Sequence, residues 1–382
     1  MVEMITGTRD TANILQAKKK IDMSETIALL QPSAAPLTSL LKQFKQNTVP
    51  ATNPRFSWME DDLGARWDEV AAAADDTTTS IVVDNGNYFS TGDLVKVPRT
   101  GEVMLVTDVN NATNTLTVVR GYGVTSAAAI VVDDPVVIIG NANEEGSGMR
   151  EIKTTKEVEV YNYTQIFKTP FGVTNTQNAT NMYGGNDLAY QRKKKGIEHL
   201  VDINRAFYFG ERKEDLTGNK PMRTTGGLLS FLTENNYDVG GPLTESEFDN
   251  NIAEVVFRYG SNEKLMLCSG RLLSVINGWA KNKLEVDQGA KNYGLNVMNY
   301  ITPFGTLKLV YDPILEGAVY GTYGIVLDIE NIKYRPLQGR DTTLETNIQN
   351  NDEDQRIDQY LTEAGIEVRL PQTHAVITGV TS

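Results

Sequence analysis

The sequence predicts an α+β protein that carries a small all-β module inside a longer extended segment. Residues 77–140 form a series of short β-branched runs separated by turn residues, a pattern typical of a compact β module. The flanking segments 54–63 and 149–173 are both extended in pattern, so they read as two halves of one arm. Helical periodicity follows over residues 185–213, and a strand, helix and strand order comes after residue 244.

The inserted module is acidic. Its expected strands are Ser80–Val83, Leu94–Val97, Glu102–Val109, Thr115–Val119 and Val136–Ile139, and its turns fall at Asn85-Gly86, Gly92-Asp93, Asn110-Asn111 and Gly121-Tyr122-Gly123. Between Asp75 and Gly148, ten acidic residues stand against three basic ones, a net charge of about −7. No residue pattern in this module indicates catalysis, so we expect a solvent-facing element that serves assembly.

The N-terminal region predicts an arm that lies on another surface. A short amphipathic helix is expected between Pro36 and Pro50, because apolar residues recur there at helical spacing, at Leu37, Leu40, Leu41 and Phe44. Such a helix needs a partner surface. The extended arm is expected to pair as a long hairpin that projects from the body and is completed by neighbouring molecules, because it carries polar residues at Asn162, Thr164, Gln165 and Lys168.

A long helix is expected over residues 185–213, with a length of about 40 Å. It contains the densest basic run of the chain, Arg192–Lys195. This run is either an ordinary solvated helix face or a docking strip for acidic residues of an adjacent subunit's arm, such as Glu157 and Glu159. In both interpretations the charge contributes to solvation or to contacts between molecules, and not to catalysis.

The C-terminal half predicts a small mixed sheet with a right-handed crossover. Helices are expected over Glu245–Tyr259 and Arg271–Leu284, with Thr244 and Ser269 at their N-termini. Strands are expected over Lys264–Cys268, Leu307–Tyr311, Tyr323–Tyr334 and Gly365–Leu370, the last two flanking an acidic loop or hairpin tip over Gln338–Asp358.

Composition excludes several classes of function. The net charge of −13 argues against a broad polyanion-binding face, one cysteine excludes an intrachain disulfide framework, and two histidines leave too few ligands for a structural zinc site. No apolar run approaches the roughly 20 residues that span a bilayer. No phosphate loop, nucleophile elbow or dinucleotide fingerprint is present. The sequence therefore predicts no enzyme, no cofactor, no metal and no membrane partner.

Three groups of residues could still suggest chemistry. Cys268 precedes a helix, but no base is near it in the sequence, so we expect a buried strand residue. His199 is expected at a surface or subunit contact, and His374 in a terminal strand. The acidic runs 60–62 and 350–354 lack the spacing of a calcium loop, which favours solvated or cross-subunit salt-bridging loops.

The order of parts resembles the tailed-phage major capsid protein with the Hong Kong 97-like fold, in the branch whose extended loop carries a β insertion. The residues that carry this resemblance are Ala35-Pro36-Leu37-Thr38, Phe56-Ser57-Trp58-Met59-Glu60-Asp61-Asp62-Leu63, Phe89-Ser90-Thr91-Gly92-Asp93, Thr100-Gly101-Glu102-Val103-Met104-Leu105-Val106, Val119-Arg120-Gly121-Tyr122-Gly123 and Ala142-Asn143-Glu144-Glu145-Gly146. The resemblance covers essentially the whole chain.

The resemblance implies a division into named regions: an N-terminal arm (1–49), an extended loop or E-loop (50–76 and 141–180), a β insertion domain (77–140), a P-domain with the spine helix (181–235), an A-domain (236–323), and P-domain strands with the tip (324–382). It implies a shell of hexamers and pentamers around double-stranded DNA, icosahedral or prolate, in the virion, made in the bacterial cytoplasm. Further implied partners are portal and decoration proteins. Because the arm begins almost at Met1, scaffolding is expected to be a separate protein, removed before maturity, or absent.

Several residues are contact candidates between subunits: Arg55, Trp58, Glu60, Trp67, Glu157, Glu159, Arg192, Lys193, Lys194, Lys195, Arg340, Asp352 and Asp354. Two other classes of protein stay open. A tail-tube or surface-layer subunit would use its β modules to polymerise in one or two dimensions, although the long charged helix argues against it. The other class is a hydrolase that uses Cys268 or a carboxylate pair.

Overall fold

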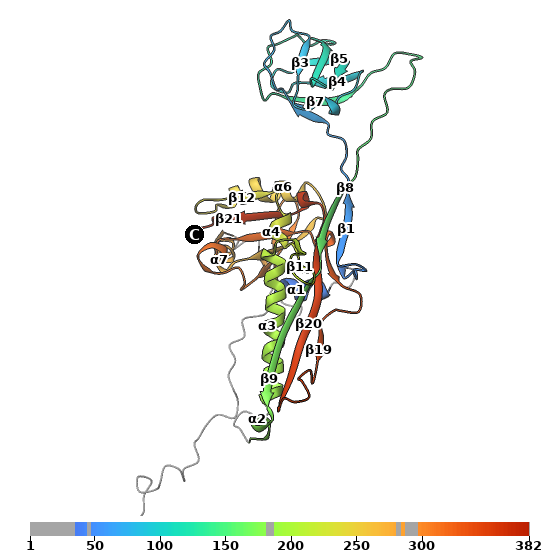
Figure 1. Cartoon of the computed structure of the whole chain (residues 1–382). Coiled ribbons are helices and arrows are strands. Elements are labelled where there is room, and N and C mark those ends of the chain that lie inside the picture. Colours follow the sequence, from blue (N-terminus) through green and yellow to red (C-terminus); the bar gives the residue numbers. More distant parts are fainter. Residues whose placement is uncertain (1–34, 44–46, 181–186, 280–283, 287–296, 382) are drawn as a thin grey trace, which may run out of the picture. The chain divides into compact units, whose positions relative to one another are not determined.

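The computed structural model describes residues 35–43, 47–180, 187–279, 284–286 and 297–381. The chain forms two compact units (Figure 1). One, which we call the body, comprises Met1–Trp58 and Val160–Ser382; the other, the barrel unit, comprises Met59–Glu159. The fold is therefore α+β with one all-β unit set into the chain.

The body is organised around one long strand pair. β9 (Gln165–Thr174) pairs antiparallel with β20 (Gln355–Val368) along its whole length, and the other edge of β20 pairs with β18 (Ile332–Pro336) and β19 (Thr343–Glu345). α3 (Asp187–Phe209) runs along these strands (Figure 1). It has 23 residues, about 35 Å of helix. It packs there because every fourth residue, His199, Ile203 and Phe207, is buried.

A seven-stranded mixed sheet forms the second layer of the body. Its strand order is β12 (Asn236–Asp238), β21 (Ala375–Thr378), β17 (Gly324–Leu327), β13 (Glu263–Cys268), β16 (Thr306–Tyr311), β15 (Val297–Ile301) and β14 (Leu284–Val286). β13 and β16 are parallel, as the strand, helix and strand order predicted. The predicted boundary at residue 323 falls inside this sheet, because β17 and β21 come from the C-terminal region.

Short helices accompany this sheet. They are α5 (Glu245–Phe248), the π-helical turn η4 (Asp249–Ala253), α6 (Glu254–Phe257), α7 (Gly270–Trp279) and α8 (Gly317–Tyr320). Thr244 forms a capping box with Glu247, and the Ser269 hydroxyl accepts from the backbone N–H of Leu272, so both predicted N-terminal residues cap their helices. Phe248, Leu272 and Tyr300 are buried together in one core cluster.

The remaining elements of the body pack mainly on α3, β9 and β18. α1 (Pro36–Gln43) buries Leu37 and Leu41, and Thr48 bridges to Tyr334 in β18. α2 (Asn175–Ala179) is capped by Thr174. α4 (Leu228–Phe231) follows a hairpin of β10 (Lys213–Asp215) and β11 (Met222–Thr224). The short N-terminal helix is thus confirmed over Pro36–Gln43, and its partner surface lies within its own chain; Phe44 of the predicted pattern lies outside the described residues.

The barrel unit is a six-stranded antiparallel sheet that closes on itself. Its order is β2 (Trp67–Glu69), β7 (Pro135–Asn141), β4 (Asp93–Lys96), β5 (Val103–Asn110), β6 (Thr115–Val119) and β3 (Ser80–Val82), with the turn η3 (Gly86–Tyr88) before β4. The two edges meet through a bridge between Val70 and Val83. A closed barrel leaves no free sheet edge. All five strands expected in the insert are present, and β2 is added from the preceding segment.

Four expectations about the secondary structure and the arm need correction, besides the long helix, which ends at Phe209 and not at residue 213. The helix expected over Arg271–Leu284 ends at Trp279 among the described residues, and Leu284 begins β14. The strand expected over Tyr323–Tyr334 is two strands in different sheets, because Asp328 caps the turn η5 (Ile329–Asn331) through the backbone N–H of Glu330. β20 starts at Gln355, inside the stretch expected to be a loop, because it pairs with β9.

The fourth correction concerns the arm. β1 (Arg55–Glu60) pairs with β8 (Val158–Tyr163), and the N–H of Thr164 donates to the carbonyl of Pro54, so the hairpin pairing of these two segments is confirmed. The expectation that its polar residues are completed by neighbours is wrong for Asn162 and Thr164, which are buried in the body. The Asn162 amide donates to the carbonyls of Gly226 and Ile366 and to the Thr225 hydroxyl, at 3.0, 2.7 and 3.2 Å.

Replacing Asn162 with Ala should therefore destabilise the body. The Asn162 side-chain oxygen also accepts from the backbone N–H of Gly226 at 2.7 Å, so the substitution leaves buried donors and acceptors unpaired. We expect a loss of about 2–3 kcal/mol in the free energy of unfolding, measured by urea titration of the full chain. Thr164→Ala is the control, because Thr164 makes one side-chain bond, to Glu363, and should cost about 1 kcal/mol. Equal losses in both variants would contradict this account.

Candidate assembly surfaces

The basic run on α3 divides into one buried contact and three surface lysines. The Arg192 guanidinium donates to the Asp358 carboxylate at 2.7 and 3.1 Å, and Asp358 is fully buried in β20. Burial would raise the pKa of Asp358, but the backbone N–H of Asn347 and Arg192 hold it below its ordinary value. Arg192 therefore joins α3 to β20 of the same chain, while Lys193 is exposed.

The other two lysines, Lys194 and Lys195, both lie near the Glu198 carboxylate, at 4.0 and 2.6 Å. These pairs lie on the helix surface, where each contributes little to stability. The basic run thus contains one ion pair within the chain, at Arg192, and three lysines on the helix surface that stay accessible to another molecule.

The candidates of β1 lie on opposite faces of the strand. Trp58 is only 5% exposed and packs on Phe231, with ring centroids 5.9 Å apart. Arg55 is exposed at the start of the strand and lies over the Tyr161 ring of β8 at 4.3 Å, and Glu60 is half-buried at its end. The indole of Trp58 is therefore part of the chain's own core and has no surface left for a subunit contact.

The acidic candidates are exposed. Glu157 and Glu159 lie at the start of β8, and Asp352 and Asp354 lie in the turn before β20. The Asn175 amide donates to Asp354 at 2.5 Å, which ties that turn to α2. Arg340 donates to the buried carboxylate of Glu363 at 2.6 Å, so it already forms an ion pair within the chain, although its side chain is half exposed.

Most of the negative charge lies in the barrel unit. Residues 59–159 contain 18 Asp and Glu against 7 Lys and Arg, a net charge of −11 out of −13 for the chain. Three of the seven basic residues pair with carboxylates of the same unit: Arg99 with Asp134, Arg120 with Glu102, and Arg150 with Asp93. The barrel unit therefore carries most of the negative net charge of the chain.

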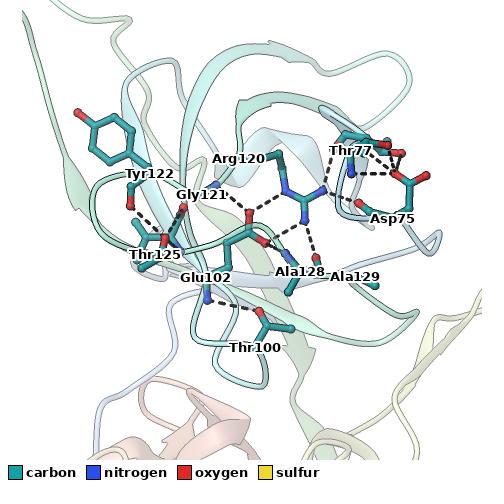
Figure 2. Close-up of polar contacts among 12 residues, drawn as sticks. Asp75, Thr77, Thr100, Glu102, Arg120, Gly121, Tyr122, Thr125, Ala128 and Ala129 are labelled. Atoms are coloured by element: carbon teal, nitrogen blue, oxygen red, sulfur yellow. Dashed lines mark hydrogen bonds and ion pairs between the residues drawn. The ribbon is translucent and has the colours of Figure 1, made fainter.

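A buried ion pair holds the end of β6 against the start of β5 (Figure 2). The Arg120 guanidinium donates two bonds of 2.8 Å to the Glu102 carboxylate, and the side chains are 6% and 0% exposed. Arg120 also donates to the carbonyls of Asp75, Thr78 and Ala128, while Glu102 accepts from the N–H groups of Gly121 and Ala128. Burial alone would raise the pKa of Glu102, but Arg120 and the two N–H groups lower it.

A second arginine pair holds the other end of the loop formed by residues 120–134. Arg99 donates to both oxygens of Asp134 at 2.7 and 2.6 Å, and this bonding lowers the pKa of Asp134. The Asp75 carboxylate accepts from the hydroxyl and backbone N–H groups of Thr77 and Thr78, which lower its pKa to about 2. Residues 120–134 are thus fixed at both ends by charge-assisted bonds.

The family is decided by a match along nearly the whole chain. A family model for the SU10 major capsid protein matches residues 4–381. This chain belongs to the SU10 major capsid protein family. The major capsid protein of Pseudomonas phage PaMx41 is 24% identical over 337 residues, covering 81% of this chain and 80% of that protein.

Solved structures agree on the fold. A chain from Mycobacterium phage Bobi has a TM-score of 0.52 at 10% identity and covers 98% of this chain and 99% of that chain. The capsid of a native GTA particle gives 0.51 at 9% identity, with coverage of 96% and 97%. The Hong Kong 97-like fold expected from the sequence is confirmed.

The capsid protein shows no reactive arrangement at the residues considered for chemistry. Cys268 is fully buried in β13, and burial raises the pKa of its thiol, so the expectation of a buried strand residue is confirmed. Over the described ranges, no group of three or more His, Cys, Asp or Glu residues could hold a metal ion. The helices of the same ranges include none that is long and apolar enough to cross a membrane.

The surface position expected for His199 is wrong. It is buried between Thr169 and Thr362, whose hydroxyls lie 2.9 and 2.7 Å from its two ring nitrogens. His374 is also buried, and its Nδ1 accepts from the backbone N–H of Asp328 at 3.0 Å. Both histidines therefore join elements of the capsid protein's own body.

Proposed function

We propose that this protein assembles as hexamers and pentamers into the icosahedral or prolate head shell that encloses the double-stranded DNA of a tailed phage. The observation that supports this most directly is the family match over residues 4–381. The body adds a physical argument: a long helix clamped to long strands by buried polar contacts gives each copy a rigid frame for repeated contacts. No catalytic role is part of this proposal.

The named regions of the sequence follow in the same proposal. Residues 1–49 act as the N-terminal arm, residues 50–76 and 141–180 as the E-loop, and residues 77–140 as the insertion domain. Residues 181–235 and 324–382 form the P-domain, and residues 236–323 the A-domain. The closed barrel formed by the residues around 77–140 supports the insertion, since it has its own core.

The contacts between copies use the exposed charges. Lys193 to Lys195 form one surface, and Glu157, Glu159, Asp352 and Asp354 form its acidic counterpart in a neighbouring copy; Arg55, Glu60, Trp67 and Arg340 add to these surfaces. Trp58 is removed from the set because it is buried. Scaffolding, portal and decoration proteins are further partners, the virion is the site of action, and the host cytoplasm is the site of synthesis.

Electron microscopy of the expressed full-length protein tests the proposal. We expect closed shells, or hexamers and pentamers on the way to them. Filaments or flat lattices would overturn it in favour of a tail-tube or surface-layer subunit. Small soluble oligomers under all assembly conditions would also contradict it.

A further inference from the structure

The outer wall of the barrel unit carries an apolar face across five neighbouring strands. We define the outer apolar face as Trp67 in β2, Val137 and Ile139 in β7, Leu94 in β4, Leu105 in β5 and Val119 in β6. The strand register places them side by side: Trp67 pairs with Val137, and Leu94 pairs with Leu105, which pairs with Val119. Five strands at about 4.8 Å spacing extend this face over about 20 Å.

These side chains point outward and not into the barrel core. Trp67 and Ile139 are each 53% exposed and Val119 is 47% exposed, whereas their inward neighbours Val136 and Val118 are buried. Ile139 is the extra residue of a bulge, because Leu94 pairs with Gly140 and Val95 with Ile138. A bulge turns a side chain outward without breaking the sheet.

The outward positions further along β5, β6 and β3 are mostly polar, apart from the half-buried Val82, which makes the apolar face distinctive. The polar positions are Thr107, Thr117 and Ser80, all exposed, and Ser80 pairs with Thr117. One closed barrel therefore has a hydroxyl side and an apolar side. A contiguous apolar surface on a soluble protein marks a site of contact.

Most of the charged residues around the face are acidic, although the exposed Arg66 directly precedes Trp67. Glu69 lies on the same side of β2 as Trp67, Asp133 precedes β7, and Glu144 and Glu145 follow it. Lys96 is exposed in the middle of the face, where it pairs with Val137 and Val103. A second barrel unit would bring another net charge of −11 to the contact, and nucleic acid would bring phosphates, so both are repelled.

We propose that the outer apolar face binds a separate protein whose contact surface is apolar at its centre and rich in Lys and Arg at its rim. The apolar row supplies the area removed from water, and the acidic rim attracts and orients the basic partner. This inference rests on the proposed shell function, because the partner binds the chain as it stands in the particle. Binding weakens as salt rises, because the rim charges are screened.

Lys96 allows a direct test, since it lies under any molecule that covers the face. The full-length protein is labelled with N-hydroxysuccinimidyl acetate as free subunits, as shells of this chain alone, and as complete virions. We expect acetylation of Lys96 to be at least tenfold slower in virions only. A lysine-to-lysine cross-linker should then join Lys96 to a lysine of a different polypeptide in virions.

Each other outcome decides against the inference. Equal labelling in all three samples means that the face is uncovered, and protection in shells of this chain alone means that a second copy covers it. A cross-link from Lys96 to another copy of this chain in virions would likewise mean that a second copy covers the face. If the chain alone forms no shells, that result counts against the proposed shell function and not against the partner-binding face.

Matched variants connect the partner to the face. Val119→Asp and Ile139→Asp add a charge at exposed positions within it, and the amount of cross-linked partner per virion should fall at least tenfold. Thr117→Asp adds the same charge to the hydroxyl side of β6 and should leave the partner unchanged. Equal loss in all three variants would show that the face has no special role.

Discussion

Replacing Arg120 with Met should destabilise the barrel unit by about 3–5 kcal/mol. The substitution leaves the Glu102 carboxylate, fully buried, with no cation beside it, and it removes donors from the carbonyls of Asp75, Thr78 and Ala128. Either Glu102 stays charged without compensation, or it takes up a proton, which costs free energy because an unfolded glutamate is ionised at neutral pH. Both routes cost stability because the carboxylate keeps only backbone N–H partners.

Hydrogen exchange of the full-length protein measures this effect for each unit separately. Because the barrel and the body have separate cores, we expect faster exchange at barrel amides such as Val95 and Met104, and unchanged exchange in β9 and β20 of the body. Uniform acceleration over both units would contradict the separation.

Two further variants show whether the uncompensated charge of Glu102 causes the loss of stability in Arg120→Met. Arg99→Met removes the pair with Asp134, but its guanidinium is half exposed and screened by solvent, so the loss should be much smaller than for Arg120→Met. Arg120→Met combined with Glu102→Gln removes both charges and should lose less stability than Arg120→Met alone. If the double variant were the less stable of the two, the packing of Arg120 and not its charge would explain the effect.

The sequence predicted the elements that follow one regular period. The five strands of the insert alternate inward and outward residues, such as Val95 and Lys96, and α3 places its buried residues three or four positions apart. Caps at Thr244 and Ser269 were also predictable, because a cap depends on residues three positions apart. Local patterns of this kind do not depend on the rest of the fold.

Polar residues in the core were not predictable in the same way. Asn162 and His199 look like surface residues in a sequence, and only the tertiary fold brings Gly226 and Ile366, or Thr169 and Thr362, to their polar atoms. The Arg120–Glu102 pair joins residues 18 positions apart. Trp58 was predicted as a contact between subunits, but it shares the buried face of its strand with Phe56 and alternates with the exposed Arg55 and Ser57.

The outer apolar face was missed for a related reason. Each of its strands contributes one or two apolar residues, which is unremarkable along the sequence. The face exists only because the register aligns Leu94, Leu105 and Val119, and because a bulge turns Ile139 outward. Strand order in a closed barrel, and not any local motif, therefore determines this candidate surface.

Lowering the pH from 7 to 5 should destabilise the body of the unassembled subunit by about 4 kcal/mol. Burial lowers the pKa of both histidines, His199 and His374, from 6.5 to about 4. Lys42 near His199 and Lys264 near His374 lower these values further, whereas the carbonyl of Arg369 and the Asp328 carboxylate oppose part of the shift at His374. The folded chain therefore holds both rings neutral at pH 5, while the unfolded chain takes up two protons.

The direction follows from this difference in proton binding. Well above pH 6.5 both rings are neutral in both states, so the full stability is present, and it is lost as the pH falls through 6.5 toward 4. At 1.36 kcal/mol per pKa unit, each histidine contributes about 2 kcal/mol of the loss at pH 5. Asp202 and Asp312 of the body oppose a small part of this loss, because burial raises the pKa of both carboxyls and the folded chain therefore binds their protons more readily than the unfolded chain.

Urea titrations of full-length subunits at pH 7 and pH 5 measure the loss, and histidine variants assign it. His199→Gln and His374→Gln should each remove about half of the difference between the two pH values, whatever they cost at pH 7. The slope against pH is the deciding quantity, because a merely structural defect lowers stability equally at both values. A double variant that still lost about 4 kcal/mol between pH 7 and pH 5 would show that other groups take up the protons.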